Sequence, residues 1–225
     1  MTSNQSTKKG SQKSKIDPFE THADRYEEWF ENHSPAYQSE LDAVDSLVPK
    51  FGSAVEIGVG TGRFSLPLGI RHGIEPARNA ARIASSKGIE IVQAVGEDLP
   101  FASSIFDFAL IVTTICFFSD ALLSLKEVYR ILKSGGCVLI GFIDRESILG
   151  RRYLHSRESP FYAEATFYSV KEISDLLTRA GFRNADYSQT LFNGDIENRQ
   201  SPREGHGTGS FVVVRASKNP QILGE

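Results

Sequence analysis

The residues best suited to chemistry lie together in the stretch 54–62, Ala-Val-Glu-Ile-Gly-Val-Gly-Thr-Gly. A short apolar run carries the carboxylate of Glu56 and leads into three glycines at alternate positions, Gly58, Gly60 and Gly62. Glycine allows positive φ and lets a ligand approach main-chain N–H groups without a Cβ in the way. With the helix-like stretch that follows, this pattern predicts a nucleotide-binding turn between a strand and a helix. The loop alone leaves open a tight turn that binds nothing.

The spacing of the glycines separates two classes of nucleotide site. The dinucleotide-binding fingerprint G-x-G-x-x-G/A needs a small residue at position 63, where this chain has Arg63. The observed G-x-G-x-G, with an acid two residues ahead, resembles motif I of the class I S-adenosylmethionine (SAM) methyltransferases. The resemblance implies that Glu56 lies near the ammonium group of the methionine moiety and that the glycines make room for the cofactor.

A second acid stands at the end of the next strand-like run, in Gly73-Ile-Glu75, 17 residues after Gly58. A carboxylate at such a strand end can accept hydrogen bonds from both hydroxyls of a ribose. A solvated acid is the alternative, and the spacing favours ribose binding. Only twelve residues separate Gly62 from Glu75, which makes the first helix and second strand unusually short for the family.

Further matches extend the resemblance from residue 19 to residue 217. The stretch Val95-Gly-Glu-Asp-Leu-Pro-Phe101, followed by Phe106-Asp107, resembles the A-E-x-L-P-F…F-D signature of the "type 11" subgroup, which is ubiquinone/menaquinone-methyltransferase-like. The stretch 125–136 matches the helix and turn that precede strand five in this subgroup, and we give it no chemical role.

The subgroup's loop after strand three lies against the adenine of the cofactor, which implies roles for Gly96 and Glu97. Relatives often carry Asp or Asn where this chain has Val95, whose side chain cannot bond the adenine amine. Adenine recognition is then left to the Gly96 N–H, to Glu97 and to packing, and a solvent-facing Glu97 remains equally open. The resemblance also places Thr113, at the end of strand four, among the cofactor residues.

The rest of the chain alternates between the two-residue period of strands and the helical period of 3.6 residues. Strand-like runs cover 54–59, 71–75, 89–94, 106–114, 136–143, 184–191 and 210–216. Helix-like runs cover 21–31, 36–48, 62–69, 76–87, 119–132 and 169–180. This alternation predicts an α/β fold with a doubly wound, mostly parallel, Rossmann-like sheet of seven strands. No helix separates the last two strand-like runs, which predicts an antiparallel edge hairpin at the C-terminus.

Composition divides the chain into one main domain and three flanking parts. Residues 1–16 form a polar, basic segment with too little apolar surface to order itself, so we expect a disordered tail. Residues 17–50 are expected to form an N-terminal helical lid, and residues 51–217 the SAM-binding domain. A substrate insert is expected at about 144–168 and a short tail at 218–225.

Charge and composition exclude several classes of partner. The net charge of −3 provides no global field that would attract nucleic acid or an anionic membrane. Without an apolar run long enough for a membrane span or an N-terminal signal core, we expect a cytoplasmic protein that makes no membrane contact. Two cysteines without a nearby pair of histidines predict reduced thiols and no metal site.

The absence of one motif narrows the class of molecule that can be the methyl acceptor. Methyltransferases that act on base amines commonly carry (Asn/Asp)-Pro-Pro-(Tyr/Phe) after strand four, where this chain reads Thr-Thr-Ile-Cys-Phe-Phe at 113–118. We therefore expect a small-molecule acceptor, with an amine or a thiol favoured because aromatic faces and a carboxylate accommodate a cation. The candidates for contact with the acceptor are Tyr26, Trp29, Phe30 and Tyr37 of the lid and Phe161 and Tyr162 of the insert.

The sequence names no certain catalytic residue. Asp144, just after strand five, is the candidate for holding or deprotonating an amine, although a surface loop explains it nearly as well. Methyl transfer by in-line displacement mainly requires that the nucleophile be aligned with the methyl group, and proximity supplies much of the rate. The resemblance thus predicts a SAM-dependent methyltransferase. Two alternatives stay open: a SAM-binding protein without transferase activity and, less favoured, a nucleotide-dependent oxidoreductase.

Overall fold

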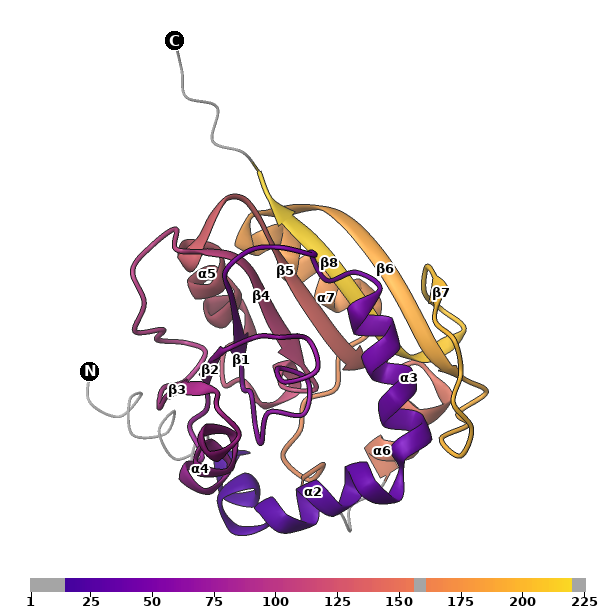
Figure 1. The fold of residues 1–225 in the computed structure, drawn as a ribbon. Helices are drawn as coiled ribbons and strands as arrows, with labels where there is room; N and C mark the ends of the chain where they lie inside the picture. Colours follow the sequence, from indigo (N-terminus) through magenta and orange to yellow (C-terminus); the bar gives the residue numbers. More distant parts are fainter. Residues whose placement is uncertain (1–14, 156–160, 220–225) are drawn as a thin grey trace, which may run out of the picture.

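The computed structural model describes residues 15–155 and 161–219 (Figure 1). The expected N-terminal tail therefore lies outside the described residues except for residues 15 and 16. The same holds for residues 156–160 of the insert and for most of the C-terminal tail.

The described residues form a single sheet of eight strands in the order β3-β2-β1-β4-β5-β8-β6-β7. Strands β1 to β5 pair in parallel, and β8 and β6 add antiparallel strands at one side. The bounds are β1 Ala54–Ile57, β2 His72–Ile74, β3 Glu90–Val92, β4 Phe106–Val112, β5 Leu132–Ile143, β6 Phe182–Phe192, β7 Arg203–Glu204 and β8 Gly209–Lys218. The prediction of a doubly wound, mostly parallel sheet is confirmed.

Six α-helices of the described chain have named bounds: α2 Ala23–Asn32, α3 Ser34–Asp45, α4 Arg78–Ser86, α5 Ala121–Ile131, α6 Ile148–His155 and α7 Val170–Ala180. Local sequence explains where several of them begin and end. Asp120 caps α5 by accepting the Leu123 N–H, and Ser169 with Glu172 forms a capping box on α7. Gly181 ends α7 in the left-handed conformation, at φ +109°.

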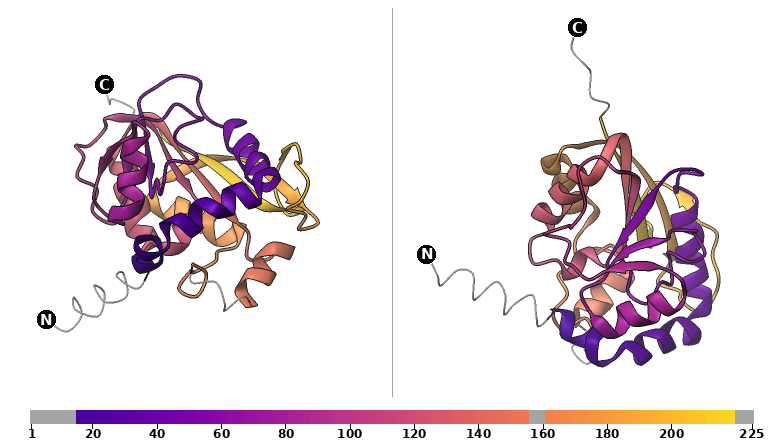
Figure 2. Two further views of the ribbon diagram at one scale, coloured as in Figure 1. Left: turned by 60° about the horizontal axis from the view of Figure 1, so that its bottom comes forward. Right: turned by 60° about the vertical axis from the view of Figure 1, so that its left-hand side comes forward.

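Helices cover both faces of the sheet, as Figures 1 and 2 show. Helices α5 and α7 pack on one face, where Leu125 and Ile173 meet inward residues of the central strands such as Ile140. Helix α3 packs on the other face, where Val44 lies in the same apolar cluster as Leu139. Because successive strand residues point to opposite faces, neighbours in β5 serve the two clusters in turn.

Parallel pairing brings the predicted chemistry to one edge of the sheet. The register sets Ile57 of β1 beside Ile74 of β2, and β4 runs along the other side of β1. The loops after β1, β2 and β4 therefore leave the sheet together, and α2 runs across these strand ends (Figure 2). Open α/β sheets bind their ligands in this place.

Two details of the sequence-based prediction are wrong. The stretch 62–69 is a series of turns rather than a helix. Pro67 lacks an N–H group and its ring crowds the carbonyl of residue 63, so a regular helix cannot continue. The count of strands is also larger than predicted, because the two-residue β7 adds an eighth, whereas the antiparallel pairing of β6 with β8 at one side of the sheet confirms the predicted hairpin.

Candidate cofactor and acceptor site

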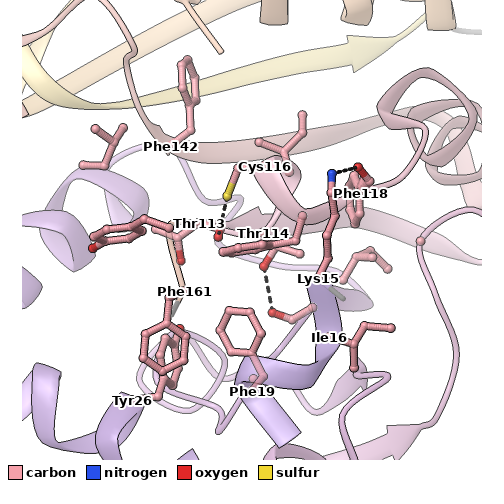
Figure 3. A pocket seen from close by; sticks show the side chains of 18 of the residues that line it. Lys15, Ile16, Phe19, Tyr26, Thr113, Thr114, Cys116, Phe118, Phe142 and Phe161 are labelled. Atoms are coloured by element: carbon pink, nitrogen blue, oxygen red, sulfur yellow. Dashed lines mark hydrogen bonds between the residues drawn. The ribbon is translucent and has the colours of Figure 1, made fainter. Parts of the chain in front are cut away.

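A cavity of about 410 Å³ lies at the carboxyl ends of the parallel strands (Figure 3). Its walls come from the glycine loop, the end of β2, the loop 94–97, the segment 113–118 after β4, the N-terminal helices and the segment 161–168. The volume falls in the range of about 300–1,000 Å³ that is usual for small-molecule pockets. Most of the residues singled out from the sequence converge on this cavity.

The glycine loop takes a conformation that requires glycine. Gly58 and Gly60 line the cavity with φ of +74° and +54°. A Cβ at Gly58 would overlap the Thr114 side chain, whereas a Cβ at Gly60 would lie an ordinary 3.5 Å from the Tyr26 ring. Gly62 is not among the residues that line the cavity, and a Cβ there would lie 2.5 Å from Ile89 Cδ1. Gly62 thus serves the packing behind the loop.

Glu75 ties the loop to the end of β2. Its Oε2 accepts the Gly60 N–H at 2.8 Å and its Oε1 accepts the Ala77 N–H at 2.9 Å. The side chain lines the cavity and is only 6% exposed. Burial raises the pKa of Glu75 to about 7, despite the two N–H groups that favour the charged form.

Glu56 lies behind the cavity wall. It is 1% exposed, its carboxylate accepts a hydrogen bond from the Ser65 hydroxyl, and it is not among the lining residues. The next residue in β1, Ile57, does line the cavity, because successive side chains alternate in direction. Burial raises the pKa of Glu56 to about 8.

The loop after β3 meets the segment after β4 at the other end of the cavity. A Cβ on Gly96 would lie 2.7 Å from the Phe118 ring, so only glycine fits there. The Glu97 carboxylate accepts the N–H groups of Ser119 and Asp120 at 2.7 and 3.1 Å, just before α5 begins. Thr113 lines the cavity at φ +49°. Glu97 thus has a structural task at the start of α5 in addition to its place in the wall.

Helix α2 is anchored to the glycine loop through one carboxylate. Glu27 accepts hydrogen bonds from the Thr61 hydroxyl and from the Arg63 guanidinium, at 2.7 Å for Nη2, and Lys87 Nζ lies 3.2 Å away. Burial by itself would raise the pKa of Glu27, but these donors outweigh burial and lower it. The residue that departs from the dinucleotide fingerprint, Arg63, therefore holds a helix over the cavity.

Aromatic side chains form the opposite wall. Tyr26, Trp29, Phe30, Phe161 and Tyr162 all line the cavity. In Figure 3, Phe19, Tyr26 and Phe161 gather across from Thr113 and Thr114; the Phe19 ring lies 5.5 Å from Tyr26 and 5.3 Å from Phe161.

Tyr37 is placed differently from the other lid aromatics. Its hydroxyl donates to the Arg63 carbonyl at 2.6 Å, and it is not among the lining residues. Its ring packs 5.2 Å from Phe30. Tyr37 therefore supports the glycine loop and the lid from outside the cavity.

Comparison with known proteins identifies the family. A family model described as a methyltransferase domain matches residues 55–140. The crystal structure of a SAM-dependent methyltransferase from Thermotoga maritima, described as a possible histamine N-methyltransferase, has 46% sequence identity and a TM-score of 0.88. That similarity covers 91% of this chain and 100% of the Thermotoga chain. This chain belongs to the SAM-dependent methyltransferases.

Two further relatives of the methyltransferase show how the similarity spreads. An uncharacterised protein of Methanocaldococcus jannaschii is 41% identical over 202 residues, which cover 89% of this chain and 98% of that protein. The demethylmenaquinone methyltransferase of Bacillus licheniformis is 26% identical over 172 residues, 62% of this chain and 74% of that one. Family membership makes the chain a methyltransferase and sets aside the oxidoreductase alternative.

The cavity of the methyltransferase fits the cofactor that the family uses. The loop offers main-chain surface at Gly58 and Gly60 with no Cβ between it and the cavity. A buried carboxylate stands at the end of β2, and a ring faces the small residue Gly96. When SAM is bound, it supplies an electrophilic methyl group attached to a sulfonium.

The structure does not bring Asp144 into the cavity of the methyltransferase. Its carboxylate accepts the Glu146 N–H at 3.1 Å, it is 7% exposed, and it is not among the lining residues. The Ser147 N–H also donates to the Asp144 carbonyl, so the chain turns sharply after β5. The Asp144 carboxylate is thus hydrogen-bonded within this turn, which leads into α6.

Sequence reasoning missed Glu40 of α3, which lines the cavity and is 4% exposed. Tyr153 of α6 lies within the expected insert, lines the cavity and stacks on Tyr162 at 4.6 Å. A signal for Glu40 existed: the residues four before and four after it on the helix, Ala36 and Val44, are both buried. An acid on the apolar stripe of a helix has to face either a partner or a cavity.

Three findings on the described part of the chain concern metal ligands, membrane-spanning helices and thiols. No group of three or more His, Cys, Asp or Glu there could hold a metal ion. Nor does that part include a helix that is long and apolar enough to cross a membrane. Burial raises the pKa of the Cys116 thiol to about 12, so it stays protonated and poorly nucleophilic at neutral pH.

Three buried acids give the folded methyltransferase a pH dependence of definite sign. The pKa of Glu75 is raised to about 7, and those of Glu40 and Glu56 to about 8, from an ordinary 4.5. The folded state thus holds these protons more tightly than the unfolded chain does. Stability without ligand is unaffected below pH 4.5 and falls as pH rises from there towards 8.

We expect Glu40→Gln to flatten part of this dependence. The free energy of unfolding of the variant, relative to the native chain, should rise by at least about 1 kcal/mol between pH 5 and pH 8, because each unit of pKa shift corresponds to about 1.4 kcal/mol. The cost of a buried amide does not change with pH, so it cancels in this comparison. Urea unfolding of both proteins at the two pH values measures the effect, and parallel pH profiles would contradict it.

Proposed function

We propose that this methyltransferase transfers the methyl group of SAM to the nitrogen of a small-molecule amine. The observation that carries the proposal is that the glycine loop and the aromatic wall line the same cavity. A polymer would need an open groove, whereas a cavity of about 410 Å³ suits a cofactor and a compact acceptor. Aromatic faces attract a cationic ligand. The description of the Thermotoga relative as a possible histamine N-methyltransferase agrees with this choice.

The positions of the residues support a definite placement of the cofactor. We assign the amino-acid part of SAM to the loop at Gly58 and Gly60, and the ribose to Glu75 at the end of β2. We assign the adenine to the space beside Gly96 and Phe118, where packing and the main chain of the loop do the recognition. Thr113 would then lie beside the reacting centre.

Two residues of the predicted cofactor set act indirectly in this proposal. Glu56 lies behind the wall and holds Ser65, so it contributes negative charge rather than a contact. The Glu97 carboxylate is hydrogen-bonded to main-chain N–H groups just before α5, so the main chain of Glu97, rather than its side chain, would face the adenine.

The lid is the segment 17–50, and its contacts support that role. Helix α2 spans the strand ends and is fixed to the glycine loop through Glu27 and Arg63. Lys15 Nζ donates to the Phe118 carbonyl at 3.0 Å, so the start of the described chain closes the adenine end. The lid excludes water from the site, which strengthens the electrostatic interactions within it.

We expect Gly60→Ala to weaken SAM binding at least tenfold while the protein stays folded. The added Cβ projects into the cofactor space, since its nearest neighbour in the protein is a ring 3.5 Å away. Gly69→Ala is the matched control, because Gly69 has a φ of +71° and nothing within 4 Å of an added Cβ. Both variants should lose about 1–2 kcal/mol of stability to the left-handed conformation. Calorimetric titration with SAM decides; equal SAM affinity in the two variants would remove this loop from the cofactor site.

We expect Glu75→Gln to weaken SAM binding by about 1.5–3 kcal/mol, the range for hydrogen bonds to a charged group. The amide oxygen can still accept one of the two main-chain N–H groups, so part of the loss could come from the loop. The comparison ligand is a SAM analogue without the two ribose hydroxyls. Its affinity should fall much less than that of SAM on the same substitution. If both ligands lose affinity equally, Glu75 shapes the loop and does not bind the ribose.

We expect methyl transfer to amines in a screen with SAM labelled in its methyl group. The acceptors would be histamine and other small amines, matched alcohols, thiols, phenols and carboxylates, with RNA and DNA as polymer controls. Transfer to amines, at rates well above those for the matched alcohols and thiols, is the expected result. Transfer confined to thiols, phenols, carboxylates or nucleic acid would overturn the proposed acceptor class without affecting the family assignment.

A further inference from the structure

Glu40 differs from the other buried acids around the cavity. Glu56 is bonded to a serine hydroxyl, and Glu75 and Asp144 accept main-chain N–H groups. Glu40 is 4% exposed and lines the cavity, yet no hydrogen bond or ion pair joins its carboxylate to any residue in the described part of the chain. Because no fully enclosed side-chain oxygen there lacks a partner, the Glu40 oxygens retain some surface, and that surface faces the cavity.

A buried acid without a protein partner is unfavourable for folding. Burying a polar group without a hydrogen bond costs free energy, and burying a charge costs more. The helix neighbours Ala36, Ala43 and Val44 are apolar and fully buried, so an apolar residue would suit the helix at this position. The acid therefore stabilises the fold less than an apolar residue would. A ligand in the cavity is the partner that the structure leaves for it.

The surroundings of Glu40 indicate the charge of that ligand. Burial raises the pKa of Tyr26 of α2, Tyr153 of α6 and Tyr162, and the negative charge of Glu40 adds to the rise at each of these tyrosines, which lie on both sides of the cavity. Four groups that can carry positive charge, Lys15, Arg25, His33 and Arg152, line the same cavity, and none of them forms an ion pair with Glu40 in the described part of the chain. One carboxylate among aromatic rings is a site for an organic cation.

We propose that Glu40 binds the ammonium group of the acceptor and accepts the proton that the nitrogen must lose before methylation. This inference rests on the proposed function, and it names the residue that recognises the acceptor and acts as general base. Neither the family resemblance nor the sequence motifs assign any role to this position.

The proton and electron balance of the step is simple. The Glu40 carboxylate takes one proton from the bound ammonium, which leaves a neutral amine with a free lone pair. That lone pair forms the N–C bond as the C–S bond of the sulfonium breaks and its electron pair stays on sulfur. The methylated ammonium departs, and the Glu40 carboxyl releases its proton to solvent, so each turnover releases one proton.

The site also brings the pKa of Glu40, the base, closer to that of the acceptor ammonium group, the acid. Burial raises the pKa of Glu40 to about 8, nearer to that of an ammonium group than an exposed carboxyl would be. Proton transfer from ammonium to carboxylate is less uphill when the two values approach each other. Titratable groups from several elements line the cavity together with Glu40: Lys15; Arg25 and Tyr26 of α2; His33 between α2 and α3; Glu75, Glu97 and Cys116; Arg152 and Tyr153 of α6; and Tyr162 and Tyr168.

The test compares Glu40→Gln with Glu28→Gln, the same substitution at an exposed position of α2. Binding is measured by calorimetry with S-adenosylhomocysteine present, for histamine, phenethylamine and tyramine and for the alcohol analogue of each. In the native enzyme at least one amine should bind more tightly than its alcohol. Glu40→Gln should remove that preference and weaken the amine at least tenfold. Glu28→Gln should match the native enzyme.

Further measurements on Glu40→Gln distinguish the proposed role from a purely structural one. SAM affinity of Glu40→Gln should stay within twofold of the native value, and its melting temperature at pH 8 should be equal or higher. Methyl transfer should fall at least a hundredfold, the rise of kcat with pH that we expect of the native enzyme should be absent, and Glu40→Asp should recover part of the rate. Loss of SAM binding together with a lower melting temperature would indicate a structural residue and overturn the inference.

The outcomes separate this inference from the proposed function. Native amine methylation that Glu40→Gln leaves unchanged would overturn the role of Glu40 and keep the proposed function. Amine binding that depends on Glu40, with methyl transfer only to thiols or phenols, would overturn the proposed function and the proton step while keeping the cation site. If no amine binds the native enzyme better than its alcohol, the cation site itself is wrong.

Discussion

The site depends on how the end of β2 holds the glycine loop. The Ile74 carbonyl accepts the N–H groups of both Gly58 and Val59, at 2.8 and 3.0 Å. The next residue, Glu75, accepts the Gly60 N–H and also the Ala77 N–H at the start of α4. One strand end therefore fixes three consecutive N–H groups of the loop. Only glycine adopts these φ values at no cost at positions 58 and 60, so the sequence pattern and the hydrogen bonds express one constraint.

The charges around the cavity follow from the cofactor and from the proposed acceptor. Burial costs free energy at Glu40, Glu56 and Glu75 alike, and it raises the pKa of each. In the proposed placement, SAM brings a sulfonium and an ammonium into the cavity that Glu75 lines and that Glu56 lies behind, and these positive charges would offset part of that cost. The enzyme would thus be least stable when empty at alkaline pH and would gain most from its ligands there. A protein under selection for stability alone would not keep three such acids together.

Much of the proposed cofactor site, at the glycine loop and the end of β2, could be predicted from the sequence, because local backbone geometry determines its residues. The spacing of Gly58, Gly60 and Glu75 expresses a turn and a strand end, and both are local features of the chain. The helical assignment of 62–69 failed because apolar periodicity outweighed the effect of Pro67. The antiparallel pairing of β6 with β8 was predictable because no helix separates the two runs, but the order in which they follow β5 was not, since the apolar pattern does not select the inner strand of a hairpin.

The proposed acceptor site is less predictable from the sequence, because its residues come from elements that meet across the cavity only in the folded chain. Asp144 follows a strand at the correct edge, but hydrogen bonds within its own turn take its carboxylate away from the cavity. Glu40 sits on a helix far from any motif and reaches the cavity only because α3 packs on the sheet beside α2. In sequence it is one acid among 28 acidic residues. Its burial, and not its type, sets it apart.

Tyr26 contacts both the glycine loop and the aromatic wall of the cavity. Its side chain lies beside that of Thr113 at the end of β4, and its ring faces Gly60. The same ring lies 5.9 Å from Phe161, across the cavity, and 5.0 Å from Phe30. The helix that carries Tyr26 is in turn fixed to the glycine loop by Glu27 and Arg63. The glycine loop and the aromatic wall therefore share one helix and one side chain, so neither part of the cavity is built independently of the other.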